Sequence, residues 1–63
     1  MKVREAVELL GGRMAVGKVL GVKERTISDW MTHNKVSGQQ AMSFYDLCKK
    51  YGVQITMAQI LGK

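Results

Sequence analysis

The chain has 63 residues, a net charge of +5 and one cysteine. This length predicts a single domain over residues 1–63, and its apolar fraction of 46% and charged fraction of 24% are those of an ordinary globular protein. The apolar runs are too short to span a bilayer, and Glu5 and Glu8 interrupt the apolar stretch that a secretory signal requires. We therefore expect a cytoplasmic protein with no membrane partner and no internal disulfide, whose basic excess favours a polyanionic partner.

The first predicted element is an amphipathic helix over residues 2–10. Its apolar residues recur at helical spacing, namely Val3, Ala6, Val7 and Leu10. Gly11 and Gly12 then stop the helix.

Two further helices are predicted over 13–20 and 24–33, joined by a tight turn. Val16 and Leu20 lie one helical turn apart, and Gly21 offers the positive φ that ends a helix. Ile27 and Trp30 resume an apolar stripe at i, i+3, which places Trp30 in the core rather than against a base. The unit over about 13–33 is therefore predicted to be a helix-turn-helix.

The second of these helices carries a compact polar face. Arg25, Ser28, Asp29 and Thr32 stand at offsets of three, four and seven, so they share one side of the helix. The major groove of B-DNA admits a single helix whose short polar side chains reach the base edges, so this face predicts DNA reading.

The last two predicted helices cover residues 38–51 and 56–61. Ser37 with Gln40, and Thr56 with Gln59, match the capping-box pattern that begins a helix. The longer helix has a wide apolar face formed by Ala41, Phe44, Tyr45, Leu47, Cys48 and Tyr51. The fold expected is all-α, a compact bundle of five helices.

The segments GRMAVGKVLGVKERTISDW and YGVQITMAQILGK resemble the domains of phage repressors and Cro-type regulators. The resemblance implies a lambda-repressor-like fold in the cytoplasm of a bacterium or a phage-infected host, with the second helix of the unit in the major groove. It also implies that Lys23 and the base-reading residues face DNA, the latter being Glu24, Arg25, Ser28, Asp29 and Thr32. Two departures are Gly17, where the family usually has alanine, and Lys23, where it has a serine or threonine cap.

Basic residues flank this face and are candidates for phosphate contacts: Arg13, Lys18, Lys23 and Lys35. The stretch from 13 to 35 has five basic and two acidic residues, which favours the DNA interpretation. The alternatives are that the lysines serve solubility and that Arg25 pairs with Asp29 at i+4.

An enzyme is not expected. His33 and Cys48 are too few to hold zinc, and Ser28, Asp29 and His33 lie on one exposed helix without an oxyanion hole. No glycine-rich phosphate loop follows a strand. We therefore expect no catalytic residue, no metal, no cofactor and no small-molecule ligand.

The function predicted is a sequence-specific transcriptional regulator that binds double-stranded DNA as a homodimer on a palindromic operator. Candidate interface residues are Phe44, Met57, Ile60 and Leu61, for which the alternative is the ordinary core of a monomer. The alternative function is a small helical protein-interaction module, such as an antitoxin or an adaptor.

Overall fold

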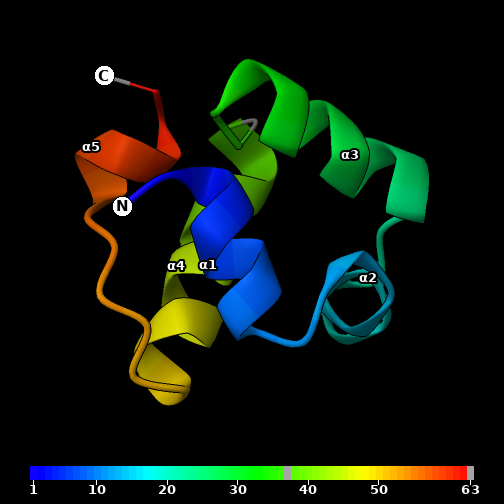
Figure 1. Ribbon diagram of the computed structural model, residues 1–63, viewed down its shortest axis with the longest axis horizontal. Coiled ribbons are helices and arrows are strands. Elements are labelled where there is room, and N and C mark those ends of the chain that lie inside the picture. Colours follow the sequence, from blue (N-terminus) through cyan, green and yellow to red (C-terminus); the bar gives the residue numbers. More distant parts are fainter. Residues whose placement is uncertain (37, 63) are drawn as a thin grey trace.

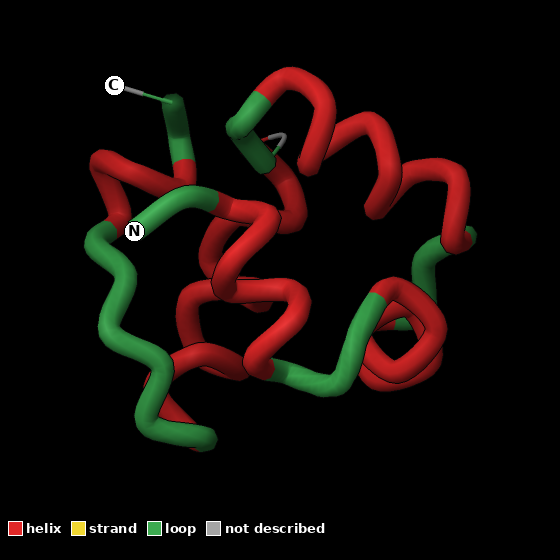
Figure 2. Tube along the Cα trace, in the orientation of Figure 1, coloured by secondary structure: helices red, strands yellow, loops and turns green. Residues whose placement is uncertain are grey.

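Five α-helices follow one another in the computed structural model, which describes residues 1–36 and 38–62 (Figure 1). Short loops connect them, and no strand occurs in these ranges (Figure 2). The helices are α1 (Val3–Leu9), α2 (Arg13–Leu20), α3 (Glu24–His33), α4 (Gly38–Lys50) and α5 (Met57–Ile60). The all-α prediction is confirmed, with helix boundaries within a residue of those expected.

The first four helices end in the same way. A residue with positive φ lies one or two positions after each, and the next backbone N–H donates to the carbonyl five residues earlier, as in a Schellman motif. After α2 the positive φ is that of Gly21, 70°, and the N–H of Val22 donates to the Gly17 carbonyl at 3.0 Å. After α3 the residue with positive φ is Asn34, whose φ is 54°. These caps satisfy helix-terminal carbonyls and turn the chain sharply, which lets short helices pack around one core.

One cluster of buried side chains draws on all five helices, with members such as Val7, Val16, Ile27, Phe44 and Ile60. Within it the ring of Trp30, 4% exposed, meets Phe44 edge to face at a centroid distance of 5.9 Å. The prediction that Trp30 belongs to the core is confirmed. This contact fastens α3 to α4 through two large apolar side chains.

Two predictions about the apolar residues need correction. Tyr51 was expected on the apolar face of the fourth helix, but α4 ends at Lys50 and Tyr51 is 62% exposed. Phe44 and Ile60 were expected at a dimer interface, but both are 0% exposed within one chain, so they have no surface to offer a second copy. Both fill the chain's own core because α4 and α5 pack against each other. Met57 and Leu61 remain partly exposed at its edge.

The beginning of α5 has the capping box expected there. The Thr56 hydroxyl accepts from the N–H of Gln59 at 3.1 Å, and the Gln59 side chain accepts from the N–H of Thr56 at 3.0 Å. The capping role expected of Ser37 falls outside the described residues.

The two ends of the described chain lie on the same side of the molecule, away from α2 (Figure 1). Met1 and Gly62 line one shallow hollow there. Two bonds hold this side together: the Asn34 side chain accepts from the N–H of Val3 at 3.0 Å, and the Ile60 carbonyl accepts from the N–H of Val36 at 2.7 Å. None of the described helices has the length and apolar character needed to cross a lipid bilayer.

Candidate nucleic-acid interface

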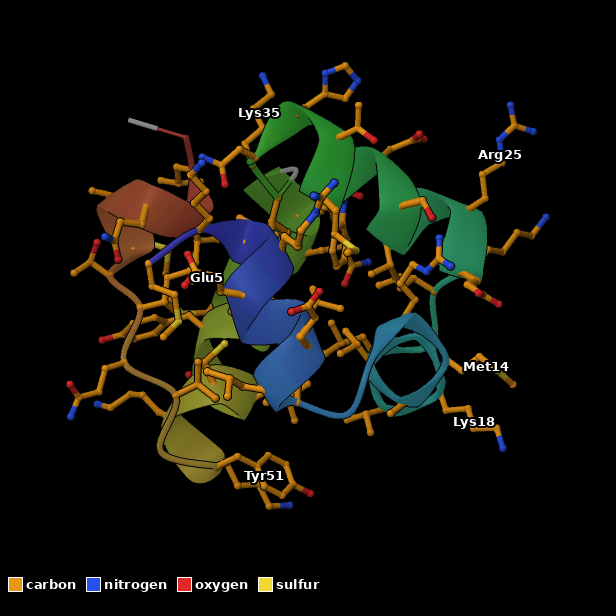
Figure 3. All side chains as sticks on the ribbon, viewed as in Figure 1. Glu5, Met14, Lys18, Arg25, Lys35 and Tyr51 are labelled. Atoms are coloured by element: carbon orange, nitrogen blue, oxygen red, sulfur yellow. The ribbon has the colours of Figure 1, made fainter. Side chains whose placement is uncertain are left out.

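Helix α3 is strongly two-sided. Ile27 and Trp30 are buried in the core, whereas Arg25, Asp29 and Thr32 are exposed on the opposite side. Figure 3 shows the Arg25 side chain extending away from the body of the protein. No ion pair joins Arg25 to Asp29 among residues 1–36 and 38–62, so both present their polar groups to solvent. The helix thus offers three polar side chains of different chemistry along one outward face.

The other two predicted base readers, Ser28 and Glu24, lie on the side of α3 that faces α2. Arg13, the first residue of α2, donates from Nη1 to the Ser28 hydroxyl oxygen at 2.7 Å, and its Nε lies 3.8 Å from Oε1 of Glu24. The side chains of Arg13 and Glu24 are 49% and 52% exposed, so the charge pair itself contributes at most about 1 kcal/mol. The structure therefore unites one predicted phosphate contact and two predicted base readers in a single network.

Sequence reasoning missed this network because Arg13 and Ser28 are 15 residues apart and belong to different helices. The available signal was an arginine at the first position of one predicted helix and an acidic residue at the first position of the next. That pattern indicates a charge pair only when the two helix beginnings are known to lie close together.

Helix α2 and the turn that leads into α3 approach each other closely at Gly17. A Cβ added at this buried glycine would lie 2.8 Å from the backbone carbonyl oxygen of Val22, well inside van der Waals contact. The glycine that stood out as a departure in the sequence therefore has a packing reason. It lets the turn that leads into α3 fold back directly onto α2.

Basic side chains surround the outward face of α3. Lys18, Lys23 and Lys35 are all exposed, and Figure 3 shows Lys18 and Lys35 projecting from α2 and from the turn after α3. Lys23 precedes α3 with extended backbone, φ of −72° and ψ of 148°, and makes no side-chain capping bond. Their exposure fits phosphate contacts and solubility equally well, so the role predicted for them stays a prediction.

The remaining reactive groups lie apart from this face. Cys48 is fully buried in α4, and burial raises the pKa of its thiol from 9.0 to about 11. Within residues 1–36 and 38–62, no three His, Cys, Asp or Glu side chains gather as a metal site would require.

No protein-family model, curated protein or solved structure matches this chain. The interpretation of the α3 face therefore depends on its own geometry and chemistry.

Proposed function

We propose that the chain is a sequence-specific DNA-binding transcriptional regulator of the phage-repressor or Cro kind. In this proposal α2 and α3 form a helix-turn-helix, and α3 enters the major groove of double-stranded DNA. The observation that carries the proposal is the outward face of α3, on which Arg25, Asp29 and Thr32 are exposed, while Ile27 and Trp30 on the opposite side are buried.

The chemistry of these three residues suits base edges. An arginine can donate two hydrogen bonds to O6 and N7 of guanine, a carboxylate can accept from N4 of cytosine, and threonine offers a hydroxyl and a methyl group. Asp29 also repels phosphate, so it favours DNA only where its carboxylate meets a donor. A face with both signs of charge therefore discriminates between sequences better than a purely basic one.

The charge around α3 supports attraction to a duplex. Residues 13–35 carry five basic and two acidic side chains, and Arg13 partly neutralises one of the acids. Phosphate contacts from Lys18, Lys23 and Lys35 would position α3 without specifying sequence.

A homodimer on a palindromic operator completes the proposal, because a helix of 10 residues reads only a short half-site. Met57 and Leu61 on and after α5 are the candidate interface residues, since both are apolar and partly exposed.

The test is selection of bound sequences from a random duplex pool, followed by affinity measurements at two salt concentrations. The proposal expects an enriched palindrome with half-sites about one helical turn apart. Weak binding that depends only on salt, with no enriched sequence, would reduce the interaction to the attraction of a basic protein for a polyanion. It would favour a protein-interaction module instead.

Arg25→Ala tests the face directly. Loss of a bidentate guanine contact costs about 1 to 3 kcal/mol in each half-site, so affinity should fall roughly 5- to 150-fold per half-site and preference should relax at one base position of each. The matched control is Lys50→Ala, which removes one exposed positive charge at the far end of α4. Equal losses in both variants would contradict base reading by Arg25.

Met57→Glu tests the dimer. A charge at the interface should abolish association in analytical ultracentrifugation, while Met42→Glu, at a methionine that is 60% exposed on α4, should leave it unchanged. Association that survives Met57→Glu would remove α5 from the interface.

A further inference from the structure

We propose that Arg13 is a positioning residue that sets the orientation of α3 through Ser28 and Glu24, and that Ser28 consequently serves this network rather than a base. The inference rests on the proposed function, because it concerns how the DNA-reading face is held.

Arg13 contacts two points on one edge of α3. Glu24 and Ser28 lie one helical turn apart, and the guanidinium group reaches both, donating to Ser28 at 2.7 Å and lying 3.8 Å from Glu24. A planar guanidinium has five N–H donors in a rigid arrangement, so it can engage two acceptors at once. The ammonium group of a lysine cannot span the same two positions with the same geometry.

The second constraint on α3 is the close approach at Gly17. Arg13 and Gly17 stand at i, i+4, so they lie on the same face of α2. At Gly17 the backbone of α2 meets the Val22 carbonyl, which fixes the distance between α2 and the turn into α3. At Arg13 the side chain fixes the rotation of α3 about its axis. Two points of contact one turn apart define an orientation that either alone would leave free.

The residues held by Arg13 are the chain neighbours of the exposed readers. Arg25 follows Glu24, and Asp29 follows Ser28. A rotation of α3 that releases the network therefore displaces both outward side chains together. Productive base contacts tolerate displacements of only a fraction of an ångström to about one, so a loosened network lowers affinity without removing any base contact itself.

The test is a double-mutant cycle on the affinity for the selected duplex, with Arg13→Ala, Ser28→Ala and the double variant. Each single change should weaken binding by up to about 5-fold per protomer, and the double variant should be little worse than either single one. Base preference should be lowered in strength but unchanged in identity, because Ser28 reads no base. Additive losses, or a changed preference at one position in Ser28→Ala, would overturn the proposal.

Arg13→Lys separates positioning from phosphate contact. It keeps the positive charge, so the salt dependence of binding should stay as in the original protein while affinity falls as in Arg13→Ala. Full affinity in Arg13→Lys would show that Arg13 acts as a phosphate contact. The matched control is Lys18→Ala on the same helix, which should reduce the salt slope by about 1 per protomer and combine additively with Ser28→Ala.

A measurement without DNA keeps this inference separate from the proposed function. In the free protein, Arg13→Ala and Ser28→Ala should change the amide chemical shift of Arg25 in the same direction, whereas Lys18→Ala should not. If the original protein selects no DNA sequence, the proposed function fails, and these shifts alone decide about Arg13. Unchanged shifts in α3 would refute the positioning role whether or not the protein binds DNA.

Discussion

Gly17→Ala is the most direct test of how α2 and α3 are packed. The substitution adds one methyl group to a buried helical position, where alanine has a helix propensity about 1 kcal/mol better than glycine. From propensity alone the variant should be more stable. The structure predicts the opposite, because the new Cβ would lie 2.8 Å from the Val22 carbonyl oxygen.

The size of the effect follows from these opposing contributions. The atom that must move is backbone, and it belongs to the turn whose Val22 N–H donates to the Gly17 carbonyl at 3.0 Å. Overpacking of this kind costs about 1 to 3 kcal/mol, and we place this case in the upper half of that range. After the propensity gain is subtracted, the net loss is about 1 to 2 kcal/mol, or roughly 5 to 15 °C in Tm for a domain of this size.

The assay is urea unfolding followed by the fluorescence of Trp30, the single tryptophan, which is buried between α3 and the core. The midpoint of unfolding should fall in Gly17→Ala with little change in slope. The matched control is Gly38→Ala in α4, where none of the described residues outside its own stretch of the helix lies within 4 Å of the added Cβ, so stability should stay equal or rise. A midpoint for Gly17→Ala at or above that of the original protein would refute the close approach.

Three other positions yield predictions for the same unfolding assay. Burial raises the pKa of the Cys48 thiol from 9.0 to about 11, so the unfolded chain loses the thiol proton at a lower pH than the folded protein. The free energy of unfolding should therefore be constant below pH 9 and fall as the pH rises towards 11. Cys48→Ala should lack that part of the pH dependence, and an equal decline in both proteins would contradict it. Asn34→Gly keeps the positive φ but removes the side-chain acceptor for the N–H of Val3, so the free energy of unfolding should fall by about 1 kcal/mol. Asn34→Ala should lower it by about a further 1 to 2 kcal/mol, because alanine at positive φ also strains the backbone. Thr56→Ala removes the hydroxyl that caps α5 and should lower the free energy of unfolding by about 1 kcal/mol. Thr56→Ser keeps a hydroxyl at this position and should retain most of that stability. Equal stability of the two variants would contradict the capping role.

The helices could be predicted from the sequence because their signals are local. Apolar spacing, capping pairs and glycines after the last turn are features of neighbouring residues, and they placed each helix to within a residue of its boundaries. The exposure of Arg25, Asp29 and Thr32 followed from the same periodicity, because the core residues Ile27 and Trp30 determine which side faces outward.

The errors concern contacts between elements. Helical spacing shows that Phe44 and Ile60 are apolar and face inward, but it does not distinguish the chain's own core from the surface of a second copy. That distinction depends on how α5 packs against α4. Arg13 illustrates the same limit, because an exposed arginine and one bonded to Ser28 in another helix have the same local sequence.

The position of the two ends of the described residues has a consequence for linking two copies. Met1 and Gly62 line the same hollow on the side of the molecule away from Arg25 (Figures 1 and 3). A flexible linker attached there would leave the outward face of α3 open. Joining two copies in tandem converts assembly into an intramolecular step with an effective concentration in the millimolar range, provided that the linker spans both half-sites. If the chain binds a palindrome as the proposed dimer and dimerisation limits binding, such a fused pair should occupy the site at concentrations where separate chains do not.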